Sequence, residues 1–121
     1  MLLRRVGLVL ILLVSCLACK RAIKSPPQEL LGVWTTDAPA YEGRYLKFEE
    51  DYFLIGVGRH TVPVIQPILK IDVRQDAKQT IYTLHSVDAD GAHELVVVYD
   101  PSDGGALRIK NQRDVVWKKR G

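Results

Sequence analysis

The pattern that most constrains the fold is an alternation of apolar and polar residues with a period of two, which runs through most of residues 29–119. The stretch LKIDVR, residues 69–74, shows it most clearly, because three aliphatic residues alternate with three charged ones. Such alternation places one row of side chains on each face of a β-strand. Turn residues recur at intervals of about 8 to 12, which is typical of all-β sandwiches and barrels. We therefore predict a single all-β domain.

The alternation and the turns predict about eight short strands. They are expected at residues 30–36, 43–49, 52–57, 69–74, 78–87, 93–99, 106–110 and 114–118. Residues 59–67, RHTVPVIQP, contain two prolines that would interrupt a ladder, so we expect a long loop or an irregular edge there. A meander of this kind closes most economically into a barrel or a strongly curved sheet, because closure removes exposed edges.

The strongest local signal is DADG at residues 88–91, where Gly91 supplies the positive φ that a tight hairpin requires. The opposite pairs expected from a turn at residues 90–91 are His85 with Val96 and His93 with Asp88. A calcium loop is not indicated, because Val97 stands where the bidentate glutamate would belong. We expect the histidines to be exposed to solvent.

The N-terminus has the layout of a secretory signal peptide, with Arg4 and Arg5 followed by an apolar run from Val6 to Cys19. A membrane-spanning helix needs roughly 20 apolar residues, and this run has 14. A short uncleaved anchor is the alternative.

Leu13-Val14-Ser15-Cys16 resembles the lipobox of bacterial lipoproteins, in which the cysteine becomes the acylated first residue. The resemblance implies lipid attachment at Cys16, with Cys19 as the alternative, and several acyl chains give stable anchoring. Residues 1–15 would then be the signal peptide, residues 16–28 a lipidated tether containing two prolines, and residues 29–119 the folded domain. No aspartate follows either cysteine, so the periplasmic face of the outer membrane is favoured. If neither cysteine were acylated, the protein would simply be secreted.

Composition excludes several classes of protein. The chain has 17 Lys and Arg against 14 Asp and Glu, and removing the signal peptide takes Arg4 and Arg5, which leaves 15 basic residues. No basic stripe interleaved with aromatic residues is present, so nucleic acid binding is not indicated. Neither a metal site nor a cofactor is predicted, because the cysteines are far in sequence from the first histidine, His60.

Gly32-Val33-Trp34 resembles the Gly-x-Trp opening of lipocalin-like barrels. The resemblance implies that Trp34 plugs one end of the barrel and that a basic residue near the C-terminus packs over its ring. The candidates by position are Arg108, Arg113 and Lys118. Trp34 as an ordinary core aromatic, anchored by its indole N–H, is the alternative. On either interpretation Gly32 and Trp34 are structural residues.

The leading functional hypothesis is an envelope lipoprotein whose barrel binds a small apolar or amphipathic ligand. The aromatic side chains available to line a cavity are Phe48, Phe53, Tyr82 and Tyr99. The alternative is a protein with a solid core that docks onto another envelope component, for which the loop residues Asp37, Tyr41 and Arg44 are candidates. An exposed apolar patch together with a filled interior would favour that alternative.

No enzyme is predicted. Ser86 and Ser102 lie in or beside turns without the sequence context of a catalytic nucleophile. A hydrolase that uses His85 or His93 would need convergent polar groups in a cleft, and the sequence does not indicate them.

Overall fold

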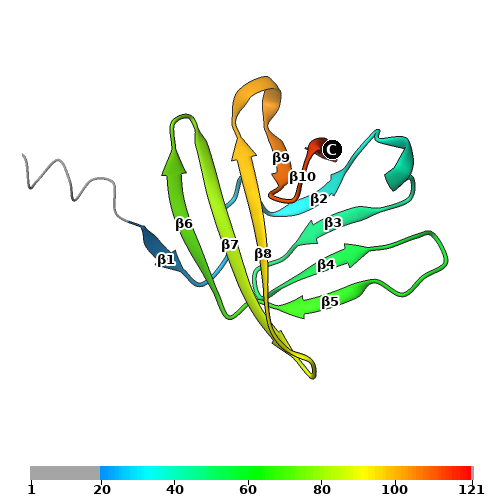
Figure 1. Cartoon of the computed structure of the whole chain (residues 1–121), viewed down its shortest axis with the longest axis horizontal. Helices are drawn as coiled ribbons and strands as arrows, with labels where there is room; N and C mark the ends of the chain where they lie inside the picture. Colours follow the sequence, from blue (N-terminus) through cyan, green and yellow to red (C-terminus); the bar gives the residue numbers. More distant parts are fainter. Residues whose placement is uncertain (1–19, 121) are drawn as a thin grey trace, which may run out of the picture.

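The computed structural model describes residues 20–120, and these form an all-β domain built on one antiparallel sheet of ten strands (Figure 1). The strands are β1 (Arg21–Ile23), β2 (Gly32–Thr35), β3 (Tyr45–Phe48), β4 (Tyr52–Gly56), β5 (Val64–Pro67), β6 (Lys70–Asp76), β7 (Gln79–Asp88), β8 (Gly91–Asp100), β9 (Ala106–Ile109) and β10 (Gln112–Lys119). Two short 3₁₀ turns, η1 (Pro39–Tyr41) and η2 (Ser102–Gly104), interrupt the connections. Within this part of the chain, no helix is long and apolar enough to span a membrane. The all-β prediction is confirmed.

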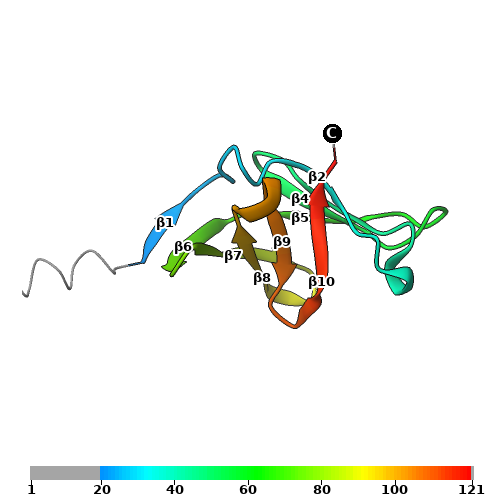
Figure 2. The ribbon, with the colours of Figure 1, turned by 90° about the horizontal axis from the view of Figure 1, so that it is seen from above.

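The sheet consists of two meanders, β2 to β5 and β6 to β10, which are joined by pairing between β10 and β2. It curves so that side chains of both meanders meet in one core (Figure 2). The terminal strands of the sheet are β1 and β5, and they do not pair with each other, so the sheet is not closed into a barrel. One contact across the opening is the Gln66 side chain, whose amide donates to Asp88 over 3.2 Å.

Prolines flank and occupy β5, one of the two edge strands at the opening. Residues 64–67 form a four-residue edge strand that pairs only with β4, whereas we expected a loop or an irregular edge over 59–67. Pro67 lies within the strand and Pro63 precedes it, and proline has no N–H to donate to a further ladder. β6 pairs with β1 on one edge and with β7 on the other, so the chain turns from β5 into β6 without the two strands pairing.

The N-terminal segment differs from the tether that we expected over residues 16–28. Arg21, Ala22 and Ile23 form β1, which pairs with Val73, Asp72 and Ile71 of β6 in antiparallel register. Ile23 packs against the core. A three-residue strand is too short for its periodicity to show in the sequence, and its partner lies far along the chain. Residues 21–23 are consequently part of the sheet.

The β7–β8 hairpin is where predicted, but its register is offset by two residues. Asp88 pairs with Gly91, and His85 faces Glu94 rather than Val96. The reason is that the turn is centred on residues 89–90 instead of 90–91. Gly91 has the expected positive φ of 120°. His93 faces Ser86 across the ladder, yet its side chain does reach Asp88, with Nε2 2.8 Å from Oδ1.

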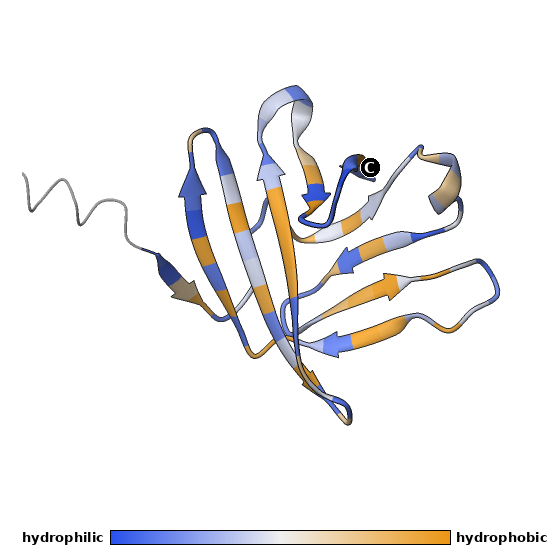
Figure 3. Ribbon diagram, in the orientation of Figure 1, coloured by the Kyte–Doolittle hydropathy of each residue, from blue (hydrophilic) through white to orange (hydrophobic). Residues whose placement is uncertain are grey.

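The core consists of twelve buried side chains from both meanders and from the segment before β2. They are Leu30, Trp34, Leu46, Phe48, Phe53, Ile71, Val73, Tyr82, Leu84, Val97, Leu107 and Trp117. The alternation along the strands that supply them is visible in Figure 3. Burial of apolar surface of this kind is the main favourable contribution to folding.

Trp34 is anchored as predicted, but its cationic partner is a different residue. The indole N–H donates to the carbonyl of Leu30 over 2.9 Å, and the ammonium of Lys119 lies 5.4 Å from the ring centroid. The expected candidates Arg108, Arg113 and Lys118 were wrong. Lys119 pairs with Trp34 in the β10–β2 ladder, whereas Lys118 lies on the other face of the strand, since successive side chains alternate.

Gly32 belongs to the same arrangement. Its φ is 118°, and a Cβ there would lie 3.7 Å from the aliphatic part of the Lys119 side chain. The left-handed backbone, more than the space, accounts for glycine at this position.

Candidate functional site

The first of two notable hollows, which we call the aromatic pocket, has a volume of about 200 Å³. It forms where the loop after β2 meets β3, β4 and the β9–β10 hairpin. Its lining residues are Tyr41, Arg44, Tyr45, Leu46, Ile55, Gly56, Val57, Ile109, Gln112 and Trp117. Two of the three predicted loop residues, Tyr41 and Arg44, are among them, and the exposed Asp37 is not.

The loop places its aromatic and cationic groups on the pocket through a short turn. Pro39 begins η1 and fixes its backbone, because its φ is already helical. The turn carries Tyr41 onto Trp117, with ring centroids 6.1 Å apart in an edge-to-face arrangement. The guanidinium of Arg44 lies 5.1 Å from the Tyr41 ring centroid, within the range of a cation–π interaction.

A glycine allows the pocket wall to form on the opposite side. Tyr45 of β3 pairs with Gly56 of β4, and the tyrosine ring lies across the glycine backbone. A Cβ at residue 56 would lie 2.1 Å from the nearest ring atom, which is far inside van der Waals contact. The tyrosine can adopt this position only because residue 56 has no side chain.

Trp117 gives the pocket its chemical character. The residue is 2% exposed, and its indole N–H has no hydrogen-bond acceptor among residues 20–120. A buried donor without an acceptor costs roughly 1 to 3 kcal/mol. The nitrogen is itself covered by protein atoms, so a molecule that displaced this cover and brought an acceptor oxygen to the N–H would recover that free energy while its apolar part contacts the aromatic rings. Sequence reasoning missed Trp117, Tyr45 and Gly56, because nothing local to each residue shows that they converge.

Of the four aromatic residues that we predicted to contact a ligand, Phe48, Phe53 and Tyr82 lie in the packed core, and Tyr99 is partly buried against it. Phe48 and Phe53 pack on each other with ring centroids 6.2 Å apart, and Tyr99 packs edge-on against Trp34 at 6.3 Å. The Tyr82 hydroxyl donates to the Glu29 carboxylate, and burial together with this hydrogen bond raises the pKa of Tyr82 well above its ordinary value. Their role in ligand binding stays a prediction.

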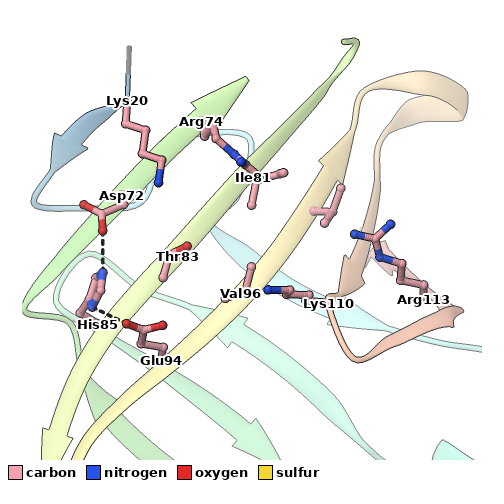
Figure 4. A pocket seen from close by; sticks show the side chains of 11 residues that line it. Lys20, Asp72, Arg74, Ile81, Thr83, His85, Glu94, Val96, Lys110 and Arg113 are labelled. Carbon is pink, nitrogen blue, oxygen red and sulfur yellow. Dashed lines mark hydrogen bonds and ion pairs between the residues drawn. The ribbon is translucent and has the colours of Figure 1, made fainter. Parts of the chain in front are cut away.

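The second hollow, which we call the basic groove, lies on the face of β6 to β8 that points away from the core and has a volume of about 370 Å³ (Figure 4). Its floor is largely apolar, and its rim carries four basic and two acidic side chains. The lining residues are Lys20, Asp72, Arg74, Ile81, Thr83, His85, Glu94, Val96, Val98, Lys110 and Arg113.

His85 lies between both carboxylates of the basic groove. Its Nε2 is 2.7 Å from Asp72 Oδ2, and its Nδ1 is 3.5 Å from Glu94 Oε1 (Figure 4). The hydrogen bond with His85 is the main cause that lowers the pKa of Asp72. Neighbouring Ser86 faces the core, so it is not paired with His85 as a nucleophile would be with its base. Among the described residues, no group of three or more His, Cys, Asp or Glu is placed to hold a metal ion.

Exposed apolar side chains gather around the β4–β5 hairpin and the strand ends beside it. They are Tyr52, Val57, Val62, Val64, Ile65, Leu69 and Val87. Val62 is 83% exposed and Ile65 is 59% exposed, which is unusual for aliphatic side chains so close together in sequence. We call the exposed residues Val62, Val64, Ile65 and Leu69 the hairpin patch, in which Val64 and Ile65 point to opposite faces of β5 because side chains alternate along a strand.

The fold and these surfaces define an all-β protein with one open, curved antiparallel sheet. Comparison with known proteins gives no match: no protein-family model, curated protein or solved structure matches the chain. The predicted signal peptide, residues 1–15, and the predicted lipid attachment sites, Cys16 and Cys19, lie outside the described residues.

Proposed function

We propose that this chain is a bacterial envelope lipoprotein, anchored through Cys16 with Cys19 as the alternative, whose non-enzymatic β domain binds a small apolar or amphipathic ligand in the aromatic pocket. The anchor is supported by the signal-like N-terminus and the lipobox resemblance. We also propose that the curved sheet is an open relative of lipocalin-like barrels. The Gly-x-Trp motif, with Lys119 over the ring of Trp34, supports that relationship.

The observation that carries the ligand proposal is the buried Trp117 N–H without an acceptor. The ligand should place a carbonyl or carboxylate oxygen against this N–H and its apolar part against Tyr41 and Tyr45. Arg44 at the rim would attract an anionic head group. The volume of about 200 Å³ is below the ~300 to 1,000 Å³ of drug-sized sites, so the pocket suits a short molecule or one end of a longer one.

The ligand proposal is tested by native mass spectrometry of the protein with decanoate, an amphipathic carboxylate, and with an envelope lipid extract. Trp117→Phe removes the N–H and keeps an aromatic side chain, with a phenyl ring in place of the indole. We expect the affinity for decanoate to fall by roughly 5- to 100-fold, the range that corresponds to one buried hydrogen bond. Tyr52→Phe is the control, because it also removes one polar group from an aromatic side chain and because Tyr52, at the start of β4, does not line the pocket. Absence of any retained ligand, or equal affinity of both variants, would reject the pocket as the binding site.

The anchor is tested separately by measuring the intact mass of the protein from a bacterial membrane fraction. Acyl mass on the chain that disappears in Cys16→Ser assigns the attachment to Cys16. Acyl mass that persists in that variant assigns it to Cys19, and an unmodified chain rejects the anchor.

The second candidate function, docking onto another envelope component, is favoured by the hairpin patch. Val62, Val64 and Ile65 expose apolar surface on a hairpin that projects from the end of the sheet remote from β1 (Figure 1). A photo-crosslinking side chain at Val62 or Ile65 in intact cells should then capture one reproducible partner. Adducts that vary between repeats would count against this function.

A further inference from the structure

The outer face of β6 to β8 carries charged and polar side chains around a strip of three aliphatic residues. Ile81, Val96 and Val98 lie on the face of β7 and β8 opposite to the core residues Tyr82 and Val97, and they form the floor of the basic groove. This aliphatic strip, enclosed by charged side chains, gives the face an amphipathic character.

The rim of the basic groove carries more positive than negative charge, with four basic and two acidic side chains. Lys20, Arg74, Lys110 and Arg113 have no carboxylate oxygen within 4.0 Å among residues 20–120. The two acidic groups of the rim are instead engaged by His85. Basic side chains that surround an apolar floor are complementary to an anionic amphipathic molecule.

The path of the chain places this groove beside the proposed anchor. Lys20 lines the groove and is held there by β1, which pairs with β6. Lys20 is the fourth residue after Cys16, and four extended residue steps span at most about 14 Å. Cys19 is adjacent to Lys20. A lipid attached at either cysteine thus brings the head-group layer to the edge of the groove.

We infer that the basic groove binds the anionic head groups of membrane lipids, so that the domain lies with its β6–β8 face against the membrane that holds its anchor. This inference rests on the acyl anchor of the proposed function and is independent of the aromatic pocket. The rim cations bind the lipid phosphates, and the apolar floor contacts the glycerol and upper acyl region. The β4–β5 hairpin lies at the end of the domain remote from β1 (Figure 1).

The test uses full-length lipidated protein, with its acyl mass verified, in vesicles of phosphatidylethanolamine with or without phosphatidylglycerol. A fluorophore is attached at Thr83→Cys on the groove floor, or at Thr61→Cys in the β4–β5 loop as the control position. Any unacylated native cysteine is replaced by serine. Lipids with nitroxide-labelled head groups quench a fluorophore that lies at the membrane surface.

We expect phosphatidylglycerol to produce strong quenching at Thr83 and none at Thr61. The double variant Lys110→Glu/Arg113→Glu should lower, at least tenfold, the ratio of domain lying on the membrane to domain free above it. The reason is that each basic residue near an anionic surface raises this equilibrium constant by a factor of about five. Lys118→Glu/Arg120→Glu, outside the groove, has the same charge change and should leave the quenching unaltered. Thermal unfolding of both double variants checks that they remain folded.

Two outcomes would overturn the inference. One is an acylated protein whose Thr83 fluorophore stays unquenched in both kinds of vesicle, which would leave the anchor intact and remove the groove as a lipid site. The other is quenching that neither phosphatidylglycerol nor the groove charge reversal changes, which would show contact without head-group recognition. Failure of the proposed anchor itself is distinguishable, because the intact mass would then show no acyl chains.

Discussion

Replacing Gly56 with alanine should destabilise the domain, and the sign of the effect should reverse when Tyr45 is also removed. The new Cβ would lie 2.1, 2.3 and 2.6 Å from three atoms of the Tyr45 ring. Ordinary van der Waals contact begins at 3.4 Å, so the ring must retreat by about 3.4 minus 2.1, or 1.3 Å. Overpacking of this kind typically costs about 1 to 3 kcal/mol.

In a Tyr45→Ala background the same substitution meets no ring. Residue 56 has an ordinary backbone conformation without positive φ, so alanine fits it. Alanine in a strand is then favoured over glycine by roughly 0.5 to 1 kcal/mol, because glycine loses more conformational freedom on folding. The double-mutant cycle, which compares the cost of Gly56→Ala with and without Tyr45, therefore predicts a coupling free energy of about 1.5 to 4 kcal/mol between the two positions.

Urea denaturation of the parent, both single variants and the double variant measures this coupling. In a domain of this size, 1 kcal/mol corresponds to a shift in Tm of roughly 4 to 8 °C, so thermal unfolding provides a second measurement. An equal cost of Gly56→Ala in both backgrounds would refute the reasoning, because it would show that the glycine is needed for its backbone and not for the Tyr45 ring.

Three further predictions concern buried and titrating groups. Ser86→Ala should raise the free energy of unfolding by about 1 kcal/mol, measured in urea, because the buried Ser86 hydroxyl has no partner among the described residues. Burial and the hydrogen bond with Glu29 raise the pKa of Tyr82. Stability should therefore fall as the pH rises above ~10, the pKa of tyrosine in the unfolded chain, because only the unfolded chain ionises there. Tyr82→Phe should remove this loss of stability at alkaline pH. Hydrogen bonds from Ser102 lower the pKa of Asp100. The stability that this ionised carboxylate contributes is present above the pKa of the unfolded chain, near ~3.9, and is lost as the pH falls through the lower pKa of the folded protein. Asp100→Asn should therefore flatten the curve of stability against pH in acid.

Most strands could be predicted because their signal is local. The 69–74 and 78–87 segments alternate over enough residues to fix both the strand and the buried face, and β6 and β7 occupy nearly those ranges. The hairpin at Gly91 was found for the same reason. Its register was missed by two residues, because sequence specifies that a turn is present more firmly than which two residues form its centre.

The remaining features depend on contacts between distant residues. β1 pairs with a strand 50 residues away, and the cation over Trp34 was misassigned because the facing of β10 decides which of Lys118 and Lys119 reaches the ring. The aromatic pocket joins Tyr41, Tyr45 and Trp117, which no spacing rule connects. Only the loop residues Tyr41 and Arg44 were recognised, through their unusual aromatic and charged composition.

The pairing of β1 with β6 also sets an order of events during folding. Arg21 pairs with Val73, a separation of 52 residues, whereas the β3–β4 and β7–β8 hairpins join neighbouring segments. Loop closure of that length follows the local pairings, because its entropy cost is recovered only once β6 is in place. β1 can therefore join the sheet only after β6 has formed, just as β2 and β10, whose Trp34–Lys119 pair is 85 residues apart, can join only after their own hairpins.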